Sequence, residues 1–191
     1  MANKISILFD SYYLYHLPQF EPLIDLLSTD KRFSIYHSTS TQISKKEFEL
    51  CKSILKKKPG LFINASNESE RQKKIRDLNL DVFICGWSRY EINKYVTPRT
   101  LVVMIYHGIG IKPSYWLDNH TRIDLRIVEG PYRIEQLRRN GVKTDLALTG
   151  FIKLDPLFQK NKININSISQ TYNLDKNKKT ILFAPTFYPS S

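Results

Sequence analysis

Six consecutive apolar or aromatic residues, Leu101–Tyr106, end abruptly at His107-Gly108. A short apolar run with this boundary is typical of a β-strand that is buried on both faces. In open α/β sheets, ligands bind outside the carboxyl ends of the strands. The run therefore predicts a covered sheet, and it places His107, Gly108 and Lys112 in a loop where chemistry is usually carried out.

Segments with strand character alternate with segments of helical character over the first 150 residues. Strands are expected at 4–9, 33–37, 61–64, 82–85, 101–105, 124–128 and 144–148. Helices are expected from about Pro22, after the N-caps Ser44 and Asn67, and from Pro131 to the left-handed cap Gly141. This alternation predicts an α/β fold with a doubly wound, mostly parallel, Rossmann-like sheet.

The chain changes character after Gly150, where it becomes polar and rich in Asn and Lys. One short helix is expected near 165–172, and residues 179–184 have the pattern of a buried strand that Pro185 ends. Because one strand cannot form a domain, we expect residues 1–158 to form one Rossmann-like domain. Residues 159–191 would be a linker and the first strand of a second domain whose remainder lies outside this sequence.

The formal net charge of +11 is the unusual global property of the chain. Many of the cations fall in the helices expected within 44–58 and 67–78, where solvated helix faces account for them. The total charge would still attract an anionic membrane surface, a phosphate-rich substrate or nucleic acid. Charge alone does not choose among these partners.

Several classes of protein are not expected. The apolar runs are far shorter than the roughly 20 residues of a membrane-spanning helix, and Asp10 interrupts the run Ile5–Phe9 too early for a secretory signal. Cys51 and Cys85 lack the spacing of a metal site, so neither a disulfide nor a bound metal is expected. These features predict a protein of the reducing cytoplasm.

His107 is the candidate catalytic base, because a histidine at a strand end can take a proton from an attacking hydroxyl. A core histidine satisfied by a backbone carbonyl fits its position equally well. Three other histidines have no acid, thiol or second histidine at ligand spacing and are left out of the chemistry: His16, His37 and His120.

A phosphate-binding role is the second hypothesis for this loop. Gly108 and Gly110 would let backbone N–H groups approach a phosphate, and Lys112 would add a positive charge. An ordinary turn and a surface lysine fit these residues as well. Arg133, in the first turn of the helix that starts at Pro131, would face either a phosphate or water.

Three segments then add up to a resemblance: YHGIGIK at 106–112, LTGFIKLDPLF at 148–158 and ILFAPTF at 181–187. Their order and spacing are similar to those of the CDP-glycerol glycerophosphotransferase family, whose members build teichoic acids and related cell-envelope polymers. The resemblance implies a GT-B architecture of two Rossmann-like domains. This chain would supply the acceptor-side domain and only the start of the donor-binding domain.

The resemblance also implies a reaction. Glycerol phosphate, or a related polyol phosphate, would pass from a CDP-linked donor to a hydroxyl of a lipid-linked saccharide or polymer, at the inner face of the cell membrane. His107 would activate that hydroxyl, and Thr186 would lie where the donor domain begins. The donor is a substrate, and no cofactor is implied. The second catalytic histidine would belong to the missing half, so this chain alone is expected to be inactive.

Departures from the family pattern leave the donor open. Ile109-Gly110 replaces the usual Thr-Pro, and Phe187-Tyr188 replaces an aromatic-Arg pair, so CDP-ribitol or a nucleotide sugar stays possible. One alternative is another GT-B glycosyltransferase or a nucleotide-sugar 2-epimerase-like enzyme, which would need carboxylates where only Glu129 is available. The alternative from another class is a non-catalytic basic binding domain. Nucleic acid is not an expected partner, since no zinc-finger, RRM or KH signature is present and aromatic residues are not interleaved with the cations.

Overall fold

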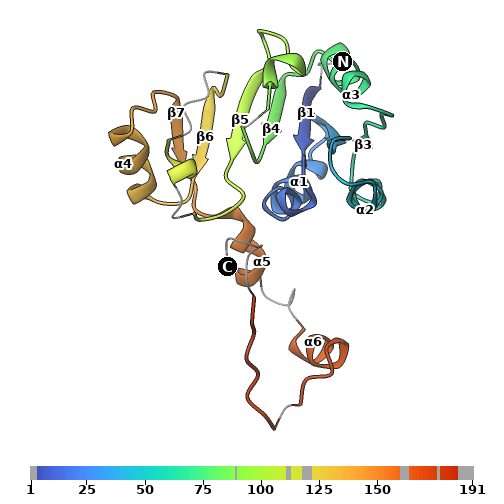
Figure 1. Ribbon diagram of the computed structural model, residues 1–191, viewed down its shortest axis with the longest axis vertical. Coiled ribbons are helices and arrows are strands. Elements are labelled where there is room, and N and C mark those ends of the chain that lie inside the picture. Colours follow the sequence, from blue (N-terminus) through green and yellow to red (C-terminus); the bar gives the residue numbers. More distant parts are fainter. Residues whose placement is uncertain are drawn as a thin grey trace. The chain divides into compact units, whose positions relative to one another are not determined.

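The computed structural model describes residues 4–88, 90–110, 113–117, 122–159, 164–175 and 177–184. The chain divides into two units, Met1–Asp155 and Pro156–Ser191, which are described separately (Figure 1).

The first unit is built on a parallel sheet that has seven strands within the described residues (Figure 1). The strands are β1 Ile5–Asp10, β2 Phe33–Ser38, β3 Leu61–Phe62, β4 Val82–Cys85, β5 Leu101–Ile105, β6 Leu125–Val128 and β7 Asp145–Leu148. They lie in the order β3-β2-β1-β4-β5-β6-β7. The predicted α/β, doubly wound fold is confirmed, and each strand agrees with its expected range to within two residues.

Helices connect the strands as parallel pairing requires. The α-helices of this unit are α1 Glu21–Ser28, α2 Lys45–Leu55, α3 Glu68–Asp77 and α4 Pro131–Arg139, and short 3₁₀ turns are η1 Leu14–Gln19, η2 Ile92–Lys94, η3 Pro113–Tyr115 and η4 Ile152–Leu154. The expected N-caps are confirmed: Ser44 Oγ accepts the Glu47 N–H at 3.2 Å, and Asn67 Oδ1 accepts the Glu70 N–H at 2.9 Å. Gly141, with φ +80°, follows the end of α4.

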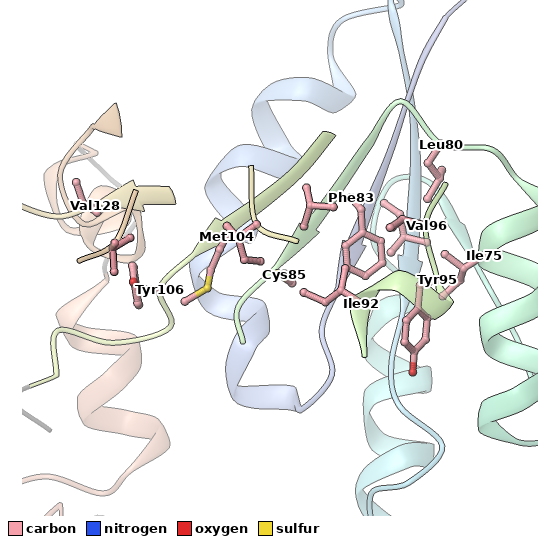
Figure 2. Packing of buried hydrophobic residues seen from close by; sticks show 14 of the residues in the cluster. Ile75, Leu80, Phe83, Cys85, Ile92, Tyr95, Val96, Met104, Tyr106 and Val128 are labelled. Carbon is pink, nitrogen blue, oxygen red and sulfur yellow. The ribbon is translucent and has the colours of Figure 1, made fainter. Parts of the chain in front are cut away.

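The strands bury side chains on both faces of the sheet. Alternate residues belong to two hydrophobic clusters, as Phe83 and Met104 do on one face and Ile84 and Val103 on the other. The first cluster also contains Ile75 of α3 and Leu137 of α4, and Figure 2 shows its packing around Phe83, Ile92 and Tyr95. The second includes Ile24 of α1 and Leu55 of α2. Helices therefore cover both faces, which makes the sheet doubly wound.

The strand order reverses direction between β1 and β4. The chain leaves β1 toward β2 on one side and leaves β4 toward β5 on the other. In open α/β sheets the loops on either side of such a point diverge, and ligands bind at the carboxyl edge of the sheet there. The loops that begin at Ser11 and Gly86 border this point, and the loop that begins after Ile105 lies one strand farther along.

A buried ion-pair network ties this edge together. Arg71 of α3 has no exposed side-chain surface, and its Nη1 donates to Asp10 Oδ1 at 2.6 Å and to Ser38 Oγ at 3.1 Å. Its Nε donates to Glu68 Oε1 at 2.7 Å. Tyr90 Oη donates to Asp10 Oδ2 at 2.6 Å. The prediction that the cations of the helix within 67–78 lie on a solvated face is wrong for Arg71, because the carboxylates of Asp10 and Glu68 hold its side chain inside the protein.

The network shifts the pKa values of Glu68 and Tyr90 in opposite directions. Burial alone raises the pKa of Glu68, but the Arg71 charge and hydrogen bonds from Arg71, Tyr95 and the Thr41 N–H outweigh it and lower that pKa from 4.5 to about 2. Burial and the nearby Asp10 raise the pKa of Tyr90 well above its usual value. Glu68 is therefore a carboxylate, and Tyr90 a neutral donor, over the physiological range.

Replacing Glu68 with Gln should lower the free energy of unfolding at pH 7 by about 3 kcal/mol, because one partner of a buried pair is removed. Since the folded pKa lies below the unfolded one, the stabilisation by Glu68 is complete above pH 4.5 and is lost as the pH falls toward 2. Urea denaturation of both proteins at pH 7, 5, 4 and 3 should show their difference shrinking below pH 4.5.

The control is Glu135→Gln in the exposed pair with Arg139, which should cost less than about 0.5 kcal/mol. If Glu68→Gln lowered the free energy of unfolding no more than the control does, the conclusion that the buried ion pair of Arg71 with Glu68 stabilises the fold would be contradicted.

The second unit, Pro156–Ser191, has little regular structure in its described part. A short helix, α5, spans the boundary at Asp155–Phe158, and α6, Ile165–Thr171, is capped by Asn164 and lies where a helix was expected. The strand predicted at 179–184 is wrong: these residues form neither strand nor helix, and Leu182 is 85% exposed. Within the described residues of this unit no neighbouring strand offers the hydrogen bonds that a strand needs. The domain boundary at 158 stays a prediction.

Among the described residues, no helix is both long and apolar enough to cross a lipid bilayer.

Candidate active site

His107 lies two residues after the end of β5, and two neighbours hold its ring. Its Nδ1 is 2.9 Å from the carbonyl oxygen of Gly86, the first residue after β4. A carbonyl oxygen only accepts, so Nδ1 carries the proton, and in the neutral ring Nε2 keeps a lone pair. Nε2 lies 3.2 Å from the Tyr115 hydroxyl, which donates to it. The half-buried ring is thus arranged to take up a proton at Nε2.

Gly110 and Gly108 determine where Tyr115 lies. A Cβ atom at Gly110 would be 2.0 Å from Cε2 of the Tyr115 ring, and one at Gly108 would be 3.1 Å from its hydroxyl. Only a residue without a side chain lets the ring lie against the backbone at Gly110. The glycine pattern predicted a phosphate-binding loop; the structure shows that the two glycines make room for the phenol that holds His107, and phosphate binding stays a prediction.

Arg133 supports the same loop from α4. Its buried side chain donates from Nε to Glu129 Oε1 at 2.8 Å, from Nη1 to Gln136 Oε1 at 2.7 Å and from Nη2 to the Gly110 carbonyl at 2.8 Å. Its guanidinium also lies 5.6 Å from the centre of the Tyr115 ring. In this structure Arg133 fixes the loop around Gly110, and its suggested contact with a phosphate stays a prediction.

His16 is the residue that the sequence analysis set aside and the structure places at the site. Its ring, in η1, is buried with its centre 5.0 Å from that of His107. Burial, and next the nearby His107, lowers the pKa of His16 to about 3. Ninety-one positions separate the two histidines, so no local spacing could have revealed the pair; the only sequence signal is that both follow strands of one parallel sheet.

The other predicted site residues lie outside the described part of the chain. These residues are Lys112 and Thr186, neither of which is among the described residues. The roles of the loop lysine and of the donor-side threonine therefore stay predictions. A hollow of about 540 Å³ lies elsewhere, between α2 and α3, where Phe48, Lys52 and Glu70 line it. It includes neither His107 nor its neighbours, and we assign it no role in the chemistry because the titratable groups and the strand ends converge at His107.

Gly110→Ala should disturb this site measurably. The added methyl group must push the Tyr115 ring away, so the hydrogen bond to His107 is lost and the free energy of unfolding falls by about 1–3 kcal/mol. Nitrogen NMR of the imidazole would report the loss at Nε2. Gly130→Ala is the matched control, because a Cβ there meets nothing within 4 Å. An unchanged Nε2 signal in Gly110→Ala would refute the packing role.

The site can now be compared with known proteins. Residues 105–190 match the model of the family CDP-Glycerol:Poly(glycerophosphate) glycerophosphotransferase. The matched segment starts at the end of β5 and contains His107, Gly110, Tyr115 and Arg133. It covers somewhat less than half of the chain, and within that span it confirms the resemblance predicted from the sequence. The match supports a transferase of the glycerophosphotransferase type. No curated protein was found to match the chain.

Proposed function

We propose that this protein transfers glycerol phosphate, or a related polyol phosphate, from a CDP-linked donor to a hydroxyl of a saccharide or polymer acceptor. The observation that carries the proposal is the state of His107: its Nδ1 is held by the Gly86 carbonyl and its Nε2 is left basic, within the segment that matches the transferase family. A histidine in this state suits the removal of a proton from a hydroxyl near neutral pH.

The proposed step is a displacement at phosphorus. The acceptor oxygen forms a bond to the phosphorus of the glycerol phosphate, the bond from that phosphorus to the bridging oxygen breaks, and CMP leaves with the bonding electrons. His107 Nε2 takes the proton of the attacking hydroxyl, and the Gly86 carbonyl then accepts a hydrogen bond from a charged imidazolium. The acceptor hydroxyl takes the position at Nε2 that Tyr115 occupies in this structure.

The buried histidine next to His107 favours this step. His16 has a pKa of about 3 and is therefore neutral when His107 becomes charged, so the two rings do not repel each other. Asp10 and Glu68, the two carboxylates of the ion-pair network at this edge of the sheet, are bound to Arg71. They are poor candidates for the free carboxylates that a 2-epimerase-like reaction would need, and we favour the transferase.

A lipid-linked acceptor at the inner face of the cell membrane is part of the same proposal. Support comes from the net charge of +11, because an anionic leaflet attracts a basic protein. Exposed lysines of α2 and of the turn after it, such as Lys45, Lys46, Lys56 and Lys57, suit such a surface. The donor-binding part would lie beyond the residues described, with Thr186 near its start.

The test is transfer of labelled glycerol phosphate from CDP-glycerol to membrane-derived acceptors by the full-length protein. His107→Gln should reduce transfer at least ~100-fold, because the base is lost while an amide can still donate to the Gly86 carbonyl. His37→Gln is the control: that ring also lies against a backbone carbonyl, Pro59 O at 2.7 Å, but in the core. It should keep transfer within about threefold when corrected for the folded fraction.

Two results would count against the proposal. Equal activity of the His107 variant and the wild type would make His107 a structural residue. No turnover of CDP-glycerol by the full-length wild-type protein would remove the donor assignment and direct the assay to CDP-ribitol and nucleotide sugars.

A further inference from the structure

A strip of aromatic rings leads from the loop after β4 to His107. Trp87, in the loop after β4, lies 5.6 Å from Tyr13 between ring centres, and Tyr13 lies 5.2 Å from Tyr15 with the two planes only 9° apart. Tyr15 in turn lies 5.3 Å from the His107 ring. Trp87 and Tyr13 are partly exposed, and Tyr15 is 50% exposed. This aromatic strip, Trp87–Tyr13–Tyr15, is therefore a chain of neighbouring rings that reaches the candidate catalytic histidine, and each of its three residues is at least partly exposed to solvent.

Buried polar atoms without hydrogen-bond partners occur in His16, which contacts the strip, and in residues of the same segment of the chain. Both ring nitrogens of His16 and both amide atoms of Gln19 are buried and make no hydrogen bond in the structure, and neither does Ser11 Oγ. The His16 ring lies 4.5 Å from Tyr15 and 5.8 Å from Tyr13 between centres. Unpaired buried polar groups are costly and rare, and several together are typical of a functional site.

We propose that the aromatic strip and the adjoining polar groups form a subsite for a sugar ring of the acceptor. The inference rests on the proposed function, since it places the acceptor beside the base that activates it. One face of a pyranose ring carries C–H bonds, which pack on the negative face of an aromatic ring. Its edge carries hydroxyl groups, which both donate and accept hydrogen bonds. The strip provides the stacking surface. His16 and Gln19 have no exposed surface in this structure, so their unpaired atoms would bind sugar hydroxyl groups only once the residues that cover them shift.

Charge and position favour a neutral sugar ring over other occupants. A glycerol phosphate chain has no flat apolar face, and its phosphates would approach the carboxylate of Glu47, which lies close enough to contribute, after burial and Tyr12, to raising the pKa of Tyr13. A nucleobase would stack on the rings, but it would then put the donor where the acceptor hydroxyl must lie to reach His107 Nε2. The strip is assigned to the acceptor for this reason.

Saturation-transfer NMR on the full-length protein tests the subsite. The probes are the methyl β-glycosides of glucose, galactose and N-acetylglucosamine, compared with glycerol 3-phosphate and CMP. We expect at least one glycoside to bind through the protons of its C–H face. Tyr15→Ala and Trp87→Ala should each weaken this binding about tenfold, whereas Tyr15→Phe, which keeps the ring, should bind like the wild type.

Tyr132→Ala serves as the matched control, because this tyrosine of α4 is 72% exposed and follows β6, two strands away from β4. Its glycoside affinity should equal that of the wild type. Retention of binding in both alanine variants, or binding of no glycoside, would overturn the subsite. CMP binding that is lost in the same two variants would also overturn it, because the strip would then hold a base.

The subsite and the proposed function fail separately. If CDP-glycerol is turned over but no glycoside binds the strip, the subsite is wrong and the transferase proposal stands. If a glycoside binds through Tyr15 and Trp87 but no CDP-glycerol is consumed, the donor assignment is wrong and a saccharide site is supported.

Discussion

The buried charge of Arg71 is the constraint on which the active edge of the sheet depends. A guanidinium with no exposed surface must be neutralised inside the protein, and Asp10 and Glu68 do so from the end of β1 and the start of α3. Asp10 is also the last residue of β1, so the network fixes the point at which the chain turns into the loop carrying Tyr13, Tyr15 and His16. An ion pair in the core thereby sets the direction of a loop at the surface.

Parallel strand pairing positions the other two elements of the site, the Gly86 carbonyl and the His107 ring. Pairing of β4 with β5 brings Cys85 opposite Met104, so Gly86 and His107 emerge from neighbouring strands at the same edge. The Gly86 carbonyl then selects the tautomer of His107. At Gly86 a Cβ would lie 2.8 Å from Gln19 Nε2 and 3.1 Å from the His16 ring. One glycine therefore allows η1 to pack close to β4 and presents a carbonyl to the catalytic candidate.

The fold was predictable because its signals are local. Hydrophobic runs, the caps Ser44 and Asn67 and the glycine after α4 each act within a few residues, and parallel topology follows from their alternation. The site was predictable only in part: His107 stands out as the end of a strand, but His16 and Arg71 acquire their roles from contacts 91 and 61 residues away in sequence. The strand expected at 179–184 failed for the converse reason, since strand character without a pairing partner does not make a strand.

The pairing of His16 with His107 explains why one histidine of the two is deeply buried. If both rings were equally exposed, both would titrate near neutral pH, and a proton on either ring would oppose the uptake of a proton by the other. Burial lowers the pKa of His16 to about 3. His16 therefore stays neutral near neutral pH, and His107 is the ring of the pair that can accept the proton of the attacking hydroxyl. The cost of leaving both ring nitrogens of His16 unpaired is then understandable. A carboxylate hydrogen-bonded to His16 would raise its pKa, and His16 would then compete with His107 for the proton.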